Sequence, residues 1–263
     1  MSLYRETFGQ GQPLILLHGW GMHGGMFQPV VRALSKTVKC IIVDLPGHGH
    51  SEPFDGLANI DSVTDYLTEQ LADVLTESVS ILGWSMSSLI AQNMVARLNN
   101  TNLQDKINKL ILVTGTPCFQ NHVKWKHGVE ADVLNTFNDQ LLQNFDKTLN
   151  RFLALQFMHA DEQKENLKLA RELVAQRPAP DAASLKLGLE LLKQTDLRDT
   201  VKDIHCPTLI INGERDTLIP TPAAKFLAEN IRQSRSVIFK GSGHAPFLSH
   251  YDQFTKQLKS FLS

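Results

Sequence analysis

The sequence predicts an α/β protein with a mainly parallel, doubly wound sheet and an inserted helical segment, and three observations support this class. Continuous apolar runs such as 14–17 and 107–113 are typical of strands that are covered on both faces. Stretches with apolar residues at helical spacing separate these runs, so strand and helix alternate. Between about 118 and 195 the alternation stops, and only amphipathic helical stretches appear.

Length, charge and cysteine content narrow the class further. A chain of 263 residues with 42% hydrophobic residues is long enough for one sizeable core with an insertion. Its formal net charge of -1 provides no overall attraction to nucleic acid or to membranes. Cys40, Cys118 and Cys206 lack metal or redox spacing, so we expect reduced thiols. Neither a signal-peptide pattern nor a membrane-spanning run is found, and we expect a cytoplasmic monomer.

The first part of the predicted core, residues 1–117, contains five strands. We expect an opening strand followed by four buried ones, at 3–8, 14–17, 38–43, 79–82 and 107–113. Helical apolar spacing fills the intervals, at 26–35, 60–77 and 89–95. Asp44 and His48 lie in the loop after the third strand, and we interpret both as structural residues that shape a turn.

The rest of the chain divides into an insertion and a second part of the core. Residues 118–195 are expected to form a helical lid, with helices at 133–145, 149–158 and 165–175. The core resumes over 196–263, with strands at 207–211 and 236–239 and a closing helix at 254–262.

The strand, turn and helix around Ser85 carry the strongest chemical signal. The sequence Gly83-Trp84-Ser85-Met86-Ser87 nearly matches the nucleophile-elbow motif G-x-S-x-G. At the apex of such a turn the serine hydroxyl projects free of strand and helix, over the positive end of the helix. Ser87 replaces the second glycine, so the motif alone is equally compatible with an ordinary turn.

An acid and a base follow later strands in the order that this chemistry requires. Asp216 comes after the strand at 207–211, and His244 lies in a glycine-flanked loop after the strand at 236–239. An imidazole can remove the serine proton, and a carboxylate can hold the imidazole in the correct tautomer. We therefore predict the triad Ser85, Asp216 and His244. The less favourably placed rivals are Glu214, Asp199, His205 and His250.

Two backbone N–H groups are expected to bind the oxyanion that forms during ester cleavage. One belongs to Met86, directly after the nucleophile, and the other to Trp20, in the glycine-punctuated loop after the second strand. This chemistry needs no metal and no organic cofactor.

With these residues assembled, the chain resembles the α/β-hydrolases over its whole length. Within that superfamily it is similar to the pimeloyl-[acyl-carrier protein] methyl ester esterases of biotin biosynthesis, and the likeness rests on residues 16–21, 43–47, 82–85, 116–119, 151–156 and 244–247. The resemblance implies the triad and the oxyanion donors named above. It also implies that the substrate contacts Trp20, Ser85, Met86, Phe152, Leu153, Ala154, Leu155, Gln156 and His244.

The same resemblance implies a reaction and a partner. The reaction is hydrolysis of the methyl ester of a pimeloyl chain on acyl-carrier protein, giving methanol and the free carboxylate while the thioester survives. Basic residues of the predicted lid are implied to receive the acidic carrier, namely Lys124, Lys126, Lys147 and Arg151. A general short-chain carboxylesterase, a thioesterase and a carbon–carbon bond hydrolase remain open as alternatives. A non-catalytic receptor on the same scaffold is the alternative from another class, but a receptor has no need of a complete triad.

Overall fold

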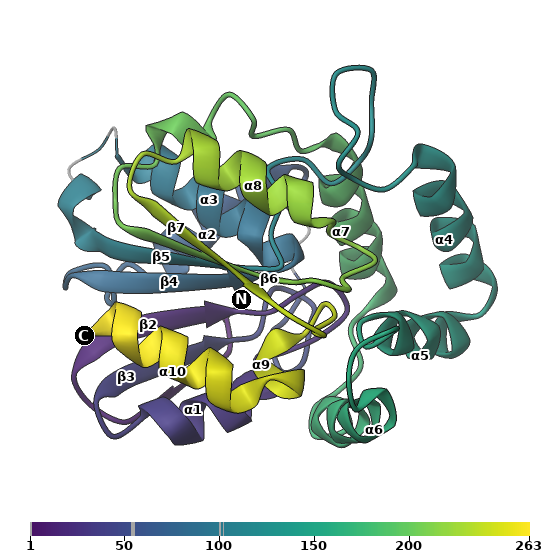
Figure 1. Cartoon of the computed structure of the whole chain (residues 1–263), viewed down its shortest axis with the longest axis horizontal. Coiled ribbons are helices and arrows are strands. Elements are labelled where there is room, and N and C mark those ends of the chain that lie inside the picture. Colours follow the sequence, from purple (N-terminus) through teal and green to yellow (C-terminus); the bar gives the residue numbers. More distant parts are fainter. Residues whose placement is uncertain (1, 54–55, 100, 102) are drawn as a thin grey trace.

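A computed structural model describes residues 2–53, 56–99, 101 and 103–263 (Figure 1). In this part of the chain one seven-stranded sheet has the order β1-β3-β2-β4-β5-β6-β7. Every neighbouring pair is parallel except β1 and β3, which are antiparallel. The predicted mainly parallel, doubly wound α/β class is confirmed. The strands are β1 (Arg5–Phe8), β2 (Gln12–Leu17), β3 (Val38–Val43), β4 (Val79–Trp84), β5 (Ile107–Val113), β6 (Thr208–Gly213) and β7 (Ser234–Phe239).

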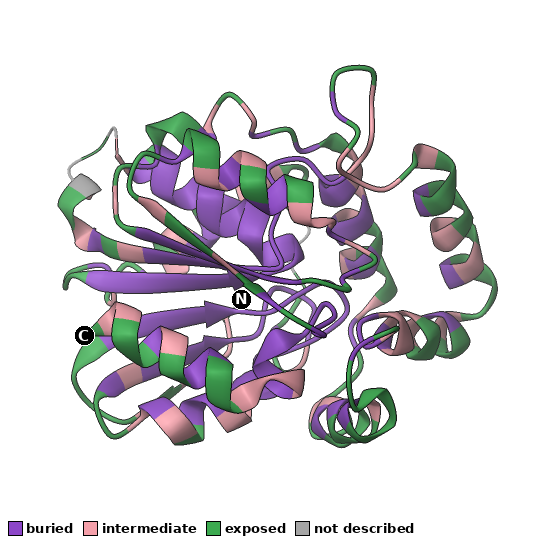
Figure 2. Cartoon of the chain, viewed as in Figure 1, coloured by how far each residue is buried: buried purple, intermediate pink, exposed green. Residues whose placement is uncertain are grey.

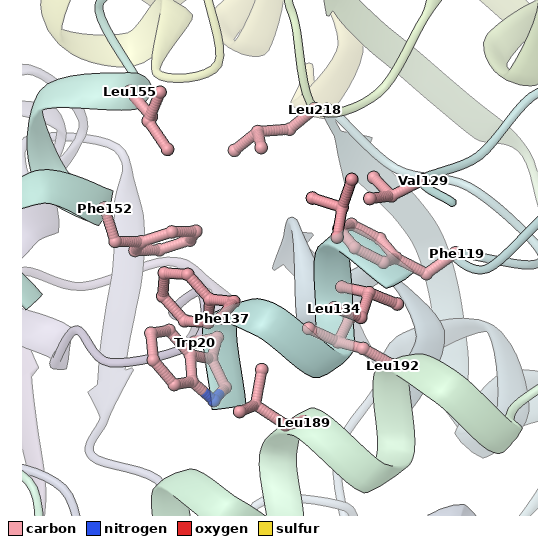
Figure 3. A pocket seen from close by; sticks show the side chains of 11 residues that line it. Trp20, Phe119, Val129, Leu134, Phe137, Phe152, Leu155, Leu189, Leu192 and Leu218 are labelled. Carbon is pink, nitrogen blue, oxygen red and sulfur yellow. The ribbon is translucent and has the colours of Figure 1, made fainter. Parts of the chain in front are cut away.

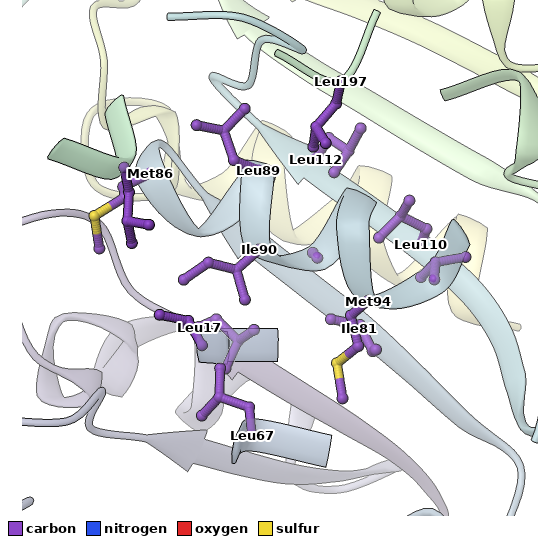
Figure 4. Close-up of a cluster of buried hydrophobic side chains, with 14 of the residues drawn as sticks. Leu17, Leu67, Ile81, Met86, Leu89, Ile90, Met94, Leu110, Leu112 and Leu197 are labelled. Carbon is purple, nitrogen blue, oxygen red and sulfur yellow. The ribbon is translucent and has the colours of Figure 1, made fainter. Parts of the chain in front are cut away.

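Helices cover both faces of the sheet, and each face buries its own apolar cluster (Figures 1 and 2). On one face lie α2 (Ile60–Gln70), α3 (Met86–Leu98) and α8 (Thr221–Asn230); Figure 4 shows side chains of α3 packed against β4 and β5. On the other face lie α1 (Gln28–Leu34) and α10 (Tyr251–Leu262). The sheet is thus dry on both sides, as its continuous apolar strands require. The short helices are η1 (Gly24–Phe27), η2 (Gln104–Lys106), η3 (Val201–Asp203) and α9 (Pro246–Ser249).

The helix expected at 60–77 is shorter than predicted, because α2 ends at Gln70. Beyond that point several N–H groups bond to carbonyls three residues back, as in Ala72 to Glu69 and Val74 to Leu71, while Leu75 bonds four residues back to Leu71. Leu71 and Leu75 remain fully buried. The apolar spacing therefore continues beyond the end of the helix, and the pattern could not show where the helix stops.

Residues 118–195, which we call the lid segment, lie between β5 and β6 and contain four helices and no strand of the sheet in the described structure. They are α4 (Ala131–Gln143), α5 (Phe145–Leu155), α6 (Gln163–Val174) and α7 (Ala182–Gln194). Figure 1 shows α4, α5 and α6 to one side of the core, beyond the end of the sheet. We did not predict α7, although Asp181 signals its start by capping it through Ser184 N–H. No helix in the described residues has the length and apolarity needed to cross a membrane.

Candidate active site

Ser85 lies at the sharp turn between β4 and α3. Its backbone has φ 58° and ψ −118°, a conformation that L-residues rarely adopt. The turn also brings Gly83 so close to the following helix that a Cβ there would lie 2.3 Å from the carbonyl oxygen of Ser87. Only glycine fits at that position. The strained turn leaves the Ser85 hydroxyl at the carboxyl end of the sheet, at the start of α3.

The structure brings Ser85, His244 and Asp216 into one hydrogen-bonded chain. The Ser85 Oγ lies 2.7 Å from His244 Nε2, and His244 Nδ1 lies 2.8 Å from Asp216 Oδ2. The second carboxylate oxygen, Oδ1, accepts the N–H groups of Leu218 and Ile219 at 2.9 and 3.0 Å. Because the carboxylate accepts a hydrogen bond from the Nδ1–H group, the imidazole keeps its proton on Nδ1, and the lone pair of Nε2 is free to accept the serine proton.

The backbone of His244 is held on both sides. Its N–H donates to the carbonyl of Gln156, just after α5, at 2.8 Å. Its carbonyl accepts the indole N–H of Trp84 at 2.9 Å and the hydroxyl of Thr114 at 3.0 Å. Gln156, expected to touch substrate, thus supports the imidazole through its main chain. The lid segment and the sheet together set the position of the imidazole.

The loop that carries Trp20 lies against the nucleophile. A Cβ on Gly19 would lie 3.2 Å from the Ser85 Cβ, so no side chain separates loop and serine. The indole Nε1 of Trp20 donates to the carbonyl of Leu185 in α7 at 2.9 Å. Met86 is the first residue of α3, where an N–H has no acceptor within the helix. Both predicted oxyanion donors therefore flank Ser85.

An apolar pocket lies beside Trp20 (Figure 3). The rings of Trp20, Phe137 and Phe152 meet edge to face there, with centroids 5.0 to 5.7 Å apart. The pocket is lined only by apolar residues, drawn from the Trp20 loop, the lid segment and the loop after β6: Trp20, Phe119, Val129, Val133, Leu134, Phe137, Phe152, Leu155, Leu189, Leu192 and Leu218.

Only part of the expected lid contact run, Phe152 to Gln156, lines this pocket. Phe152 and Leu155 are three residues apart on α5 and therefore share a face of the helix. Leu153 lies on another face and is buried in a core cluster. Leu153, Ala154 and Gln156 are not among the lining residues, and their contact with a bound chain stays a prediction. The lining residues of α4 and α7 were not predicted, because their only signal in the sequence is the helical spacing of their apolar residues.

Asp44 serves the structure, as we interpreted it. Its carboxylate accepts the N–H groups of Gly24 and His50 at 2.7 and 2.9 Å and pairs with Arg177 at 2.6 Å. Burial alone would raise the pKa of Asp44, but the guanidinium and the two N–H groups outweigh burial and hold that pKa below its usual range. Arg177 also pairs with Glu6 of β1. This cluster ties the end of the lid segment to the core.

Three histidines near the site are buried, and we expect them to make the protein less stable in acid. His18 donates from Nδ1 to Gly19 O and accepts Leu45 N–H at Nε2, and burial lowers its pKa to about 3. Burial also lowers the pKa values of His23 and His48. In the unfolded chain these groups protonate near pH 6.5. Between about pH 6.5 and 3, His18 is therefore protonated in the unfolded chain but neutral in the folded one. Each pH unit of acidification in this range lowers the free energy of unfolding by about 1.4 kcal/mol.

We expect the free energy of unfolding to fall as the pH is lowered from 7 to 5, because the unfolded chain takes up protons that the buried histidines do not bind. Urea unfolding at several pH values measures it. A free energy that does not change over this interval would contradict the neutral, buried state of these histidines.

Several other residues named from the sequence have partners or positions of their own. Glu214, a rival carboxylate, accepts Gly241 N–H at 3.0 Å. Lys147 and Arg151 line one polar pocket on α4 and α5. Lys124 and Lys126 lie in the loop before α4 and do not line that pocket.

One group of possible metal ligands occurs in the described residues. Side-chain atoms of Cys118, His122 and Asp196 lie within 4.8 Å of one another. Arg198, however, donates from Nη2 to Asp196 at 2.7 Å and to His122 at 3.0 Å, so a guanidinium already provides the positive charge. Burial, with Asp196 nearby, raises the pKa of the Cys118 thiol to about 11, which disfavours the thiolate that a metal needs. We assign no metal to this group.

The fold and the Ser85–His244–Asp216 geometry are those of an α/β-hydrolase, and the comparisons agree. The sequence model of the alpha/beta hydrolase family matches residues 14–257, and the chain belongs to this family. The predicted resemblance is confirmed.

Individual relatives are similar along nearly the whole chain. A pimeloyl-[acyl-carrier protein] methyl ester esterase of Aeromonas hydrophila is 37% identical over 262 residues, which span 100% of both chains. That of Nitrosomonas europaea is 36% identical over 253 residues and 96% of each chain. Among solved structures, an esterase from Exiguobacterium antarcticum superposes with a TM-score of 0.88 at 26% identity, over 98% of this chain and 94% of the other. The predicted assignment to the carboxylic ester hydrolases is confirmed.

Proposed function

We propose that this chain hydrolyses the methyl ester of a pimeloyl group on acyl-carrier protein, as a step of biotin biosynthesis. The observation that carries the proposal is the hydrogen-bonded Ser85–His244–Asp216 chain beside a wholly apolar pocket. The names of the full-length relatives support the choice of substrate. The cytoplasmic location and the monomeric state stay predictions.

The reaction follows from the position of each group. Ser85 Oγ attacks the carbonyl carbon of the methyl ester while His244 Nε2 takes the serine proton, and Asp216 stabilises the imidazolium that forms. The N–H groups of Trp20 and Met86 bind the oxyanion. The C–O bond to the methoxy group then breaks, and His244 returns the proton to give methanol. Water, deprotonated by the same imidazole, attacks the acyl-enzyme, releases the carboxylate and restores Ser85.

The apolar pocket favours the ester over its product. A methylene chain and an uncharged methyl ester bury well against its aromatic and aliphatic side chains. The carboxylate forms at Ser85, next to this pocket, whose lining has no cationic side chain to pair with it, and burying an unpaired charge is costly. Product release is therefore favoured once the ester is cut.

A path for the carrier-linked end of the chain leads outward along α4 and α5. A neighbouring pocket shares Val133, Phe137 and Leu155 with the apolar pocket. It shares Gln140 and Arg151 with the polar pocket that Lys147 also lines. The surface thus changes from apolar near Trp20 to polar and basic at its outer end. This gradient fits an acyl chain inside, with the thioester and an acidic carrier outside.

Reversing two charges at the outer end tests this path. We expect Lys147→Glu with Arg151→Glu to raise KM for the carrier-linked ester about tenfold, because both changes oppose an acidic partner. Hydrolysis of p-nitrophenyl butyrate, which has no carrier, should stay unchanged. The matched control is Lys124→Glu with Lys126→Glu, the same change of charge in the loop before α4. Equal effects of the two pairs on KM would contradict docking centred on this pocket and would point to a response to charge over the wider lid surface.

Substrate preference tests the proposed function itself. We expect kcat/KM for the pimeloyl-carrier methyl ester to exceed that for p-nitrophenyl butyrate at least about 100-fold, since only the former fills both pocket and path. Equal or higher values for the simple ester would make the chain a general carboxylesterase. Release of the whole acyl group from the carrier would make it a thioesterase.

A further inference from the structure

Ser87 occupies the place of the second glycine in the elbow motif, and its side chain makes a contact that glycine cannot make. The residue is fully buried, and its Oγ donates a hydrogen bond to the carbonyl oxygen of His18. Ser87 is the second residue of α3, and His18 directly follows β2. We propose that Ser87 is a positioning residue that holds the two halves of the oxyanion hole at a fixed separation.

The hydrogen bond lies close to both proposed donors. On one side, Ser87 follows Met86, whose N–H is the donor at the start of α3. On the other side, only Gly19 separates the His18 carbonyl from Trp20 and its N–H. β2 and β4 already pair as far as Leu17 and Gly83, and the Ser87 bond adds a direct link beyond the strand ends, where the oxyanion forms. Oxyanion stabilisation depends on the placement of its donors, so a small shift lowers the rate of the chemical step.

The rest of the loop is already fixed, which makes the Ser87 bond effective. The His18 imidazole donates to Gly19 O at 2.8 Å and accepts Leu45 N–H at 2.9 Å. The indole of Trp20 is bound to Leu185 of α7. These contacts tie the loop to its surroundings but not to α3. The hydroxyl of Ser87 supplies the link to the helix that carries the other donor.

The chain offers a matched control in the next residue. Ser88 is also fully buried in the first turn of α3. Unlike that of Ser87, its Oγ has no hydrogen-bond partner among the described residues. Ser88→Ala therefore removes a hydroxyl of equal burial from the same turn without breaking a bond.

The inference rests on the proposed catalytic site, and the experiment separates the two. With p-nitrophenyl butyrate as substrate, we expect Ser87→Ala to lower kcat about tenfold with little change in KM, a fraction of the loss when a donor is removed outright. Affinity for a trifluoromethyl ketone, which forms a tetrahedral adduct with the serine, should fall by a similar factor. Ser87→Gly, which restores the motif glycine, should show the same losses, and Ser88→Ala neither.

Each outcome is informative. If Ser87→Ala and Ser87→Gly match Ser88→Ala in kcat and in ketone affinity, the positioning role is excluded, even if they melt at a lower temperature. If Ser87→Ala does not fold, Ser87→Gly and the weaker donor Ser87→Cys carry the same comparison. Full activity in Ser85→Ala would instead overturn the proposed site, whatever the Ser87 variants do.

Discussion

Replacing Ser85 by alanine is expected to lower kcat for ester hydrolysis at least about 10⁴-fold while the protein stays folded. The hydroxyl bonds to His244 Nε2 at 2.7 Å and is the group that the proposed mechanism acylates. His244→Ala should cause a loss of similar size, because the two side chains act as one unit. Stopped assays with purified variants measure the loss, and circular dichroism checks the fold.

Covalent labelling provides the control for this prediction. A serine-directed phosphonate should label the wild-type chain once and should not label Ser85→Ala. A wild-type chain that takes no label and has no esterase activity would favour the receptor alternative. Wild-type turnover in Ser85→Ala would place the nucleophile elsewhere.

Asp216→Asn is expected to lower kcat about 10⁴-fold, the second large effect. Asp216 Oδ1 accepts the N–H groups of Leu218 and Ile219, so an asparagine keeps its carbonyl oxygen on that side. Its NH₂ group then faces His244 Nδ1, where it can only donate. The imidazole must place its proton on Nε2 and can no longer take the proton of Ser85. The variant should therefore fold normally and bind substrate with little change in KM.

Glu214→Gln is the matched control for this change. Glu214 lies in the same turn, and its carboxylate bonds to Gly241 N–H rather than to the imidazole. We expect turnover within about threefold of wild type, as for a polar contact away from the reacting atoms. A larger loss of turnover in Glu214→Gln than in Asp216→Asn would show that Glu214, and not Asp216, orients the imidazole.

The core of the fold could be predicted from the sequence, because the patterns that indicate its strands and helices are local. Buried parallel strands are continuous apolar runs, and their alternation with helices predicts the sheet. The order of Ser85, Asp216 and His244 after three strands then predicts where they gather, since parallel strands end at one edge. The 2.7 and 2.8 Å hydrogen bonds between them are consistent with that prediction.

Other features depend on contacts that no local pattern encodes. The apolar pocket exists only because the lid segment folds back over the site. This fold brings together Leu134 and Phe137 of α4, Leu189 and Leu192 of α7, and Leu218 of the loop after β6. The partner of Ser87 lies 69 residues earlier in the chain. The motif requires only a small residue at position 87. From the sequence alone, Ser87 is therefore interpreted as a weakened match to the motif and not as a hydrogen-bond donor.

The most direct test of the account is the mass of carrier-linked pimeloyl methyl ester after incubation with wild-type protein and with Ser85→Ala. We predict that the wild-type chain removes the mass of one methylene group, as expected for methyl ester to carboxylic acid, and leaves the acyl group on the carrier. Ser85→Ala should leave the mass unchanged. A carrier that loses the whole acyl group, or an intact ester after prolonged incubation with wild type, would contradict the account.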